Sequence, residues 1–270
     1  MPSLRKSLDR KASFLYRLPF GFAFEAAAWR HRAKPLPDLR FLIVAQGRTG
    51  STFLTSSLNS HPQLVCADEI LDRPMLLPRA YAENRARGAG GLGFGFHTKP
   101  MDHLVRMQRE QDVRRFLSAM HGDGWKIIHL CRAHHLAHLI SLQVARENRV
   151  YHVTESKQLR KKTVSLDPDK ITRRVAGRAD AMAWERRLLE DIPHLALEYG
   201  RDIKSPEVQD QTLLRIQNFL GIEPMPTSTP LKKAVTKPLS DTVENWPEVE
   251  RALSGTEYAY LLTEAEGVKP

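Results

Sequence analysis

The sequence predicts an α/β domain in which helices flank a central parallel sheet. Short apolar runs alternate along the chain with segments whose apolar residues recur at helical spacing, and this alternation is typical of strands joined by helical crossovers. Of the 270 residues, 41% are hydrophobic and 27% are charged, which is ordinary for a globular protein and unlike a disordered chain or a membrane bundle. The two cysteines, Cys66 and Cys131, exclude a disulfide framework and a CxxC metal site.

Each predicted element rests on its local pattern. Residues 41–45 form a continuous apolar run, as expected for a strand buried on both faces, and a helical pattern follows from Thr52. Asp167 and Pro168 are typical of a helix start, and Gly221 is typical of a helix end. We expect strands at 41–45, 64–66, 92–99, 125–130 and 194–199, helices at 52–58, 103–120, 136–145, 168–192 and 208–220, and irregular segments at 72–92 and 150–166.

Residues 1–38 are predicted to form a basic arm that precedes a single domain at 39–270. Neither a secretory signal nor a membrane-spanning segment is visible, and with so few cysteines this favours a cytoplasmic protein. The aromatic residues of the arm suit peripheral contact with an anionic membrane. Alternatively they pack back onto the domain, because Pro19 and Gly21 are expected to interrupt a continuous amphipathic helix. These aromatic residues are Phe14, Tyr16, Phe20, Phe22, Phe24 and Trp29.

The distribution of charge indicates an anionic partner. The net charge is +10, of which residues 1–40 carry +6, residues 41–200 carry +7 and residues 201–270 carry −3. A nucleotide, a sulfated or phosphorylated small molecule, a phospholipid surface or a nucleic acid would each suit this balance. Nucleic acid is the weakest of these interpretations, because only 7% of the residues are aromatic and most of them lie in apolar runs.

The turn after the first strand has the composition of a phosphate-binding loop. Glycines allow the backbone to curl around an anion, and the N-terminus of the following helix adds a favourable field. The Walker A pattern is not met, since Ser51 stands where its lysine would be, so a P-loop kinase or ATPase is disfavoured. Arg48 strengthens the prediction, because a guanidinium can bind two anionic oxygens at once. The residues of this candidate anion site are Gly47, Arg48, Thr49, Gly50, Ser51 and Thr52.

Arg132 and Ser141 form a second candidate site. Arg132 follows the strand at 125–130, and Ser141 lies in the next predicted helix. Because the carboxyl ends of parallel strands face the ligand crevice, we expect Arg132 to lie beside the first loop, where it could hold a second phosphate with the Ser141 hydroxyl as a donor.

Together these segments resemble the sulfotransferases that use 3′-phosphoadenosine 5′-phosphosulfate (PAPS), and most of all the bacterial carbohydrate sulfotransferases of the nodulation-factor and trehalose types. The resemblance extends from about residue 41 to residue 262. It is carried by residues 44–54, 60–62, 68–71 and 128–132 with Ser141, and more weakly by 195–199, 219–222, 231–233, 244–246 and 255–258.

The resemblance implies a P-loop-like sulfotransferase architecture and a set of roles. The loop at 47–53, which extends the candidate anion site to Phe53, would bind the 5′-phosphosulfate, and Arg132 and Ser141 would hold the 3′-phosphate. Lys232 and Lys233 would close over the nucleotide, with solvated lysines as the alternative. Where relatives often carry Gly-Phe-Lys after the third strand, this chain has His97, and Lys99 follows two residues later on the same face of an extended strand.

Sulfuryl transfer needs stabilisation of the leaving phosphate and a base for the acceptor hydroxyl. Arg48 suits the first task without a metal, and Glu69, His97 and His129 are the candidate bases. Glu69 stands where carbohydrate-type relatives carry an acidic residue, and the alternative is a solvated carboxylate. The histidines at 134, 135 and 138 have helical spacing but lack an intervening Glu or a further ligand, so we expect no metal site.

We therefore expect a PAPS-dependent sulfotransferase that acts on a hydroxyl of a carbohydrate or glycolipid. A PAPS- or nucleotide-binding protein without transfer activity is the alternative. No motif in the sequence indicates which acceptor is used or what the oligomeric state is.

Overall fold

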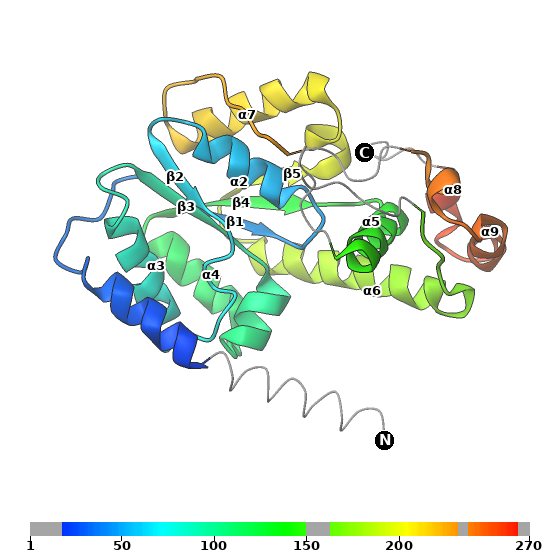
Figure 1. The fold of residues 1–270 in the computed structure, drawn as a ribbon, viewed down its shortest axis with the longest axis horizontal. Helices are drawn as coiled ribbons and strands as arrows, with labels where there is room; N and C mark the ends of the chain where they lie inside the picture. The colour runs from blue at the N-terminus through cyan, green and yellow to red at the C-terminus, as the bar shows by residue number, and fades with distance from the viewer. Residues whose placement is uncertain (1–17, 150–162, 232–236, 264–270) are drawn as a thin grey trace.

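The fold is a five-stranded, entirely parallel sheet flanked by helices, as predicted (Figure 1). The computed structural model describes residues 18–149, 163–231 and 237–263. The strand order is β2-β3-β1-β4-β5, so β1 lies at the centre between β3 and β4. All five predicted strands are confirmed, and their bounds are β1 Arg40–Ala45, β2 Leu64–Ala67, β3 Gly93–Thr98, β4 Trp125–Cys131 and β5 His194–Glu198.

Helices connect and extend these strands. The α-helices with stated bounds are α2 Ser51–Asn59, α3 Pro78–Arg87, α4 Val113–Gly122, α5 His135–Asn148, α6 Pro168–Leu189, α7 Pro206–Leu220, α8 Leu239–Thr242 and α9 Trp246–Ser254. Two wider π-helical segments, η1 Pro100–Met107 and η2 Tyr199–Ile203, follow β3 and β5, and a short 3₁₀ helix, η3 Ala259–Leu262, follows α9.

Two predicted segments are wrong. The stretch 72–92 was expected to be irregular, but it contains α3, which begins at Pro78 in the first helical turn and buries Tyr81, Ala82 and Ala86. The single helix expected at 103–120 is two helices, η1 and α4. The break falls at the polar residues 108–112, and Asp112 starts α4 by accepting a hydrogen bond from the Arg115 backbone N–H at 2.8 Å. Of the other segment expected to be irregular, residues 150–162 lie outside the described residues.

The sheet separates two apolar layers. Successive side chains of a strand point to opposite faces. In β1, Phe41 and Ile43 therefore join α2 and α7 in one core, while Leu42 and Val44 join α4 and the end of α6 in the other. Figure 1 shows α2 and α7 on one side of the sheet and α3, α4 and α6 on the other. A third apolar cluster joins α5, α6 and α9 beside the sheet.

The Phe41 ring lies over Gly95 of the neighbouring strand β3. Phe41 is paired with Gly95, and a Cβ atom added to Gly95 would lie 2.1 Å from the Phe41 ring. The opposite face of β3 carries Phe94 and Phe96, whose rings meet Trp125 edge-on at centroid distances of 6.3 and 5.4 Å. The absence of a side chain at Gly95 therefore leaves room for the Phe41 ring on one face of β3, while Phe94 and Phe96 fill the other face.

Residues 18–29 are helical and lie against the domain. The expectation that Pro19 and Gly21 interrupt this helix is wrong, because Pro19 lies near its described start and Gly21 faces the domain. A Cβ atom at Gly21 would be 1.8 Å from the Pro74 carbonyl oxygen, so the close approach requires glycine. The rest of the predicted arm, with Phe14 and Tyr16, lies outside the described residues. Among the helices that the structure describes, none has the length and apolar character needed to cross a membrane.

Candidate functional site

The loop after β1 has a backbone shaped for an anion. Arg48 and Gly50 both adopt positive φ angles, 71° and 93°, and Gly50 begins α2 in the left-handed conformation. A positive φ is uncommon for a residue with a side chain, and such strain concentrates at ligand sites. The Thr49 hydroxyl closes the turn by donating to the Gln46 carbonyl at 2.7 Å. No side chain caps the start of α2 within the described residues, which leaves its first N–H groups for a ligand.

The structure brings Arg132 and Ser141 to this loop, as expected. Arg132 Nη1 donates to the Arg48 carbonyl oxygen at 3.2 Å, and Arg48 Nε donates to Ser141 Oγ at 3.2 Å. The Arg132 guanidinium also stacks on the Tyr199 ring at 4.4 Å from its centroid. Arg132 and Ser141 are buried. Arg48 and Arg132, which follow β1 and β4, are thus brought to the same place at the carboxyl edge of the sheet.

Two further residues, which the sequence did not predict as part of the site, also support the loop. His138 Nε2 donates to the Gly47 carbonyl at 2.7 Å, and burial followed by the charge of Arg132 lowers the His138 pKa to about 3, so the ring is neutral. Arg178 of α6 donates to Gln46 Oε1 at 2.8 Å. The helical spacing on α5 drew attention to His138 but gave it no role at the loop, and nothing in the sequence of α6 distinguishes Arg178.

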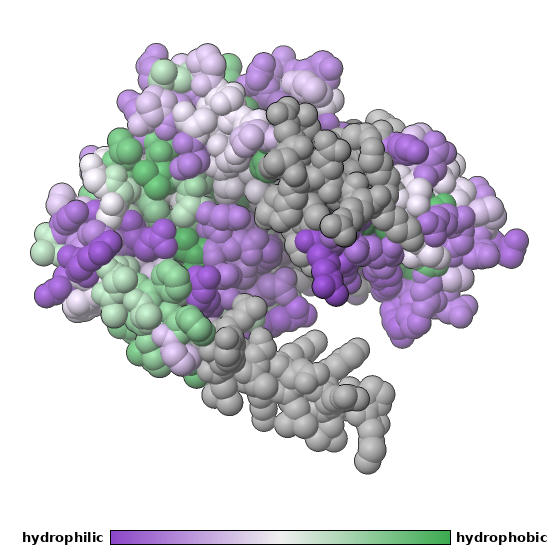
Figure 2. All heavy atoms as spheres, viewed as in Figure 1, coloured by the Kyte–Doolittle hydropathy of each residue, from purple (hydrophilic) through white to green (hydrophobic). Residues whose placement is uncertain are grey.

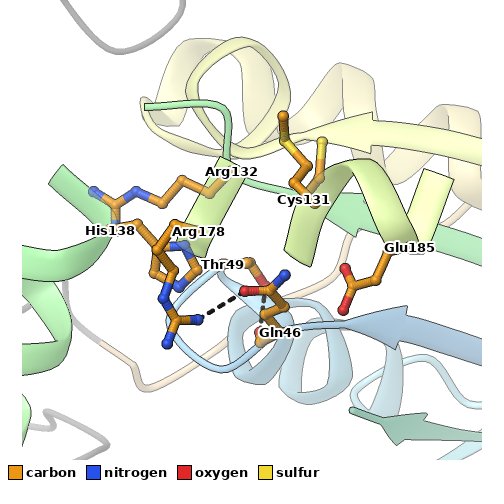
Figure 3. Close-up of a pocket in the computed structure, with 8 residues that line it drawn as sticks. Gln46, Thr49, Cys131, Arg132, His138, Arg178 and Glu185 are labelled. Carbon is orange, nitrogen blue, oxygen red and sulfur yellow. Dashed lines mark hydrogen bonds between the residues drawn. The ribbon is translucent and has the colours of Figure 1, made fainter. Parts of the chain in front are cut away.

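Figure 3 shows a small cavity behind the loop, with Arg132, His138 and Arg178 gathered near its rim. Its volume of about 10 Å³ suits a single water molecule. Arg178 reaches it from α6 and Arg132 from the end of β4. The cavity is lined by Gln46, Thr49, Cys131, Arg132, His138, Arg178, Met182 and Glu185.

Glu69 lies in a cluster of basic side chains after β2. Its Oε1 is 2.5 Å from Lys99 Nζ, and its Oε2 accepts a hydrogen bond from His103 Nε2 at 3.1 Å. Burial alone would raise the pKa of Glu69. The hydrogen bonds from His103 and Lys99 and the Lys99 charge outweigh it and lower that pKa to about 2. Glu69 is therefore a carboxylate at neutral pH and not a freely solvated one.

The tautomer of His103 follows from its contacts. Its Nδ1 accepts a hydrogen bond from the Lys99 backbone N–H at 3.1 Å, so the proton of the neutral ring is on Nε2 and points at Glu69. Burial lowers the His103 pKa despite its carboxylate neighbour. His103 is a positioning residue for Glu69 that sequence reasoning missed, because the π-helical turn that aims it has no clear sequence pattern.

His97 is also in this cluster, but its ring is fully buried. Its Nε2 contacts the Ala45 carbonyl at 3.2 Å, and its Nδ1 lies 3.6 Å from Asp68 and 3.8 Å from Glu69. Nδ1 has no hydrogen-bond partner among the described residues. Full burial of the ring disfavours direct contact with an acceptor, and Nδ1 makes no hydrogen bond to either carboxylate.

Lys99 joins the two parts of the site. Its Nζ contacts Glu69, and it also lies against the loop, since a Cβ atom at Gly47 would be 3.6 Å from Lys99 Cε and 3.9 Å from Nζ. The side chains at positions 97 and 99 were expected to share a face. Both lie close to Glu69, which confirms this expectation. The carboxylate and the anion loop are thus separated by one ammonium group.

The remaining candidates are placed elsewhere or lie outside the description. His129 is buried in β4, 3.7 Å from the buried carboxylate of Glu185, and so away from the Glu69 cluster. The histidines at 134 and 138 diverge, because Nδ1 of His134 caps the start of α5 while His138 bonds the loop. Lys232 and Lys233 lie outside the described residues.

The oxygens and ring nitrogen of Asp68, Glu69 and His97 are close enough to be considered as metal ligands. Both oxygens of Glu69, however, already contact Lys99 and His103. An ammonium ion at 2.5 Å would repel a cation bound to the same carboxylate. These residues fit an ion-pair cluster better than a metal site.

Comparison with known proteins adds no assignment: no protein-family model matches the chain, and no curated protein shows significant similarity to it.

Proposed function

We propose that this protein transfers a sulfuryl group from PAPS to a hydroxyl of a carbohydrate or glycolipid, on a P-loop-like sulfotransferase architecture. The observation that carries the proposal is the arrangement around Lys99. An ionised carboxylate, an ammonium group and a glycine-bearing loop lie next to one another at the carboxyl edge of a parallel sheet. Ligands of open α/β sheets bind at this edge.

The site offers two positions for anionic groups. The N–H groups at the start of α2 and the Arg48 side chain suit the 5′-phosphosulfate. Arg132 and Ser141, tied to Arg48 by the two 3.2 Å hydrogen bonds, suit the 3′-phosphate. Stacking on Tyr199 holds the Arg132 guanidinium in a fixed plane, which favours bidentate binding of a phosphate.

The chemistry assigns one task to each group. The acceptor oxygen forms a bond to sulfur, and the bond from sulfur to the bridging phosphate oxygen breaks with its electron pair moving to the phosphate. The forming O–S bond makes the acceptor hydroxyl strongly acidic, so its proton can pass to Glu69 despite the low pKa of that carboxyl, and the nucleotide leaves as 3′,5′-adenosine bisphosphate. The positive charges of Lys99 and Arg48 stabilise the negative charge that develops on the bridging oxygen. The hydrogen bond from His103 holds the carboxylate in place.

Nucleotide selectivity tests the binding half of the proposal. In a thermal-shift titration, 3′,5′-adenosine bisphosphate should stabilise the wild type far more than 5′-AMP. A charge-assisted hydrogen bond is worth about 1.5–3 kcal/mol, so Arg132→Ala should weaken binding of the bisphosphate by about ten- to a hundredfold and leave 5′-AMP nearly unaffected. Arg114→Ala is the matched control, because Arg114 pairs with Asp191 on the surface. Equal stabilisation by both nucleotides in the wild type would reject the assignment of the 3′-phosphate site.

Transfer itself is tested with labelled PAPS and a panel of sugars and glycolipids. Glu69→Gln keeps the shape of the side chain and removes the proton acceptor, so turnover should fall by about 10²–10⁴-fold while the bisphosphate still binds. A wild-type protein that binds PAPS but labels no acceptor would favour the alternative, a nucleotide-binding protein without transfer activity.

A further inference from the structure

An apolar surface lies away from the candidate site, on the helix at 18–29 and the neighbouring residues Leu76 and Leu77. The two leucines are 70% and 62% exposed, the highest values among the large apolar side chains that are exposed in the described residues. In Figure 2 hydrophobic residues gather on the part of the molecule where Figure 1 places this helix. The exposed side chains of this docking surface are Phe20, Phe22, Phe24, Trp29, Leu76 and Leu77.

The fold fixes this exposure. Glu25 accepts hydrogen bonds from the backbone N–H groups of Leu76 and Leu77 at 2.9 and 2.7 Å, so its carboxylate is used to hold both leucines in position. Gly21 and Ala28 are the buried side of the helix. The helix and the segment before α3 enclose an open groove of about 340 Å³, whose apolar lining includes Phe22, Ala26, Trp29, Leu76, Leu77 and Tyr81.

Arginine side chains surround the apolar residues. Arg32 lies over the Trp29 ring at 5.3 Å, and Arg73 lies over the Phe24 ring at 4.4 Å. Arg85 lies over the buried Tyr81 ring at 5.9 Å. The residues that precede this helix in the sequence, 1–17, add five Lys or Arg and one Asp.

We propose that this surface docks the protein on an anionic lipid bilayer. Aromatic and leucine side chains beside arginines match the apolar and anionic layers that meet at a membrane interface. A second copy of the chain fits less well, because a twofold contact would place the same arginine-rich rims against each other. The inference rests on this surface alone and does not require sulfuryl transfer.

The docking surface is connected to Glu69 by a short, braced segment. Residues 70–75 run from Glu69 to Leu76, and Gln108 holds them through hydrogen bonds to Leu71, Arg73 and Met75 at 2.7–3.0 Å. Six residues therefore separate the docking surface from Glu69 along the chain.

Vesicle flotation of the full chain tests the proposal. The probes are vesicles of phosphatidylcholine alone and vesicles of phosphatidylcholine with phosphatidylglycerol, each at low and high salt. The wild type should float with the anionic vesicles, less at high salt because salt screens the attraction. The total tryptophan emission should shift to the blue, because Trp29 is exposed in the free protein. Leu76→Ser/Leu77→Ser should lower the partition coefficient at least about tenfold, since each exposed leucine loses its burial in the apolar phase.

Leu214→Ser is the matched control, because Leu214 is a 45% exposed leucine on α7. It should float like the wild type, and both variants should keep the wild-type melting temperature. Flotation unchanged in the double variant overturns the proposal, as does no flotation of the wild type with anionic vesicles. If the wild type is instead a dimer that the double variant converts to a monomer, the surface is an interface between copies. Flotation measures membrane association and does not depend on nucleotide binding or sulfuryl transfer, so its failure can be told apart from failure of the proposed function.

Discussion

Replacing Lys99 by methionine should expose how strongly this residue controls Glu69. Methionine keeps the length and apolar stem of the side chain but removes the ammonium group 2.5 Å from Glu69 Oε1. His103 still donates to the other oxygen. The variant therefore changes one of the two groups that keep the pKa of Glu69 low.

The size of the effect follows from the pKa of Glu69. A fall from 4.5 to about 2 corresponds to at most about 3–4 kcal/mol of folding stability at neutral pH. His103 shares this effect and solvent screens part of it, so Lys99→Met should cost about 1–2 kcal/mol at pH 7. Because the folded pKa is the lower one, this contribution is complete above about pH 4.5 and is lost as the pH falls towards 2. The difference between wild type and variant should shrink in the same range.

Urea unfolding followed by circular dichroism at pH 7, 5, 4 and 3 measures this difference. Lys170→Met is the control, because Lys170 pairs with Asp167 in an ion pair whose lysine is 57% exposed, and such pairs contribute little. A Lys99→Met difference that stays constant from pH 7 to pH 3, or that equals the control at pH 7, would refute the reasoning.

Two further predictions concern packing and the orientation of the carboxylate. Gly95→Ala should lower the free energy of unfolding by more than about 2 kcal/mol, because its Cβ would overlap the Phe41 ring, whereas Gly122→Ala has open space and should be neutral or stabilising in urea unfolding. His103→Leu should raise the pKa of Glu69 in a carbon-13 NMR titration, and His103→Gln should largely restore the low value because its amide can still donate. A pKa that is the same in both His103 variants would show that the donor is irrelevant.

The parts of the fold that depend on local pattern could be predicted. The apolar run at 41–45 and the glycine-bearing turn after it are visible in the sequence, and parallel topology then brings Arg132 to the loop. The helix α3 was missed because the prolines and glycines around it outweighed its short apolar pattern.

The residues around Glu69 and around the loop could not be predicted from the sequence, for a different reason. Lys99 and His103 reach Glu69 from positions 30 and 34 residues later, and Arg178 reaches Gln46 across 132 positions. Such contacts depend on the register of neighbouring strands and on the turn of a π-helix. No short sequence pattern predicts the strand register or the π-helical turn.

The central position of β1 has a consequence for how the protein is made. β1 pairs with β3 and β4, and Arg132 contacts Arg48 across 84 positions. A nascent chain that ends before β4 lacks every contact that Arg132 and His138 make with the loop. Because pairing of distant strands is slow compared with local helix formation, the anion loop acquires its shape only late in synthesis. Slower release of β4 from the ribosome would therefore delay the appearance of binding-competent protein without changing the affinity of the finished site.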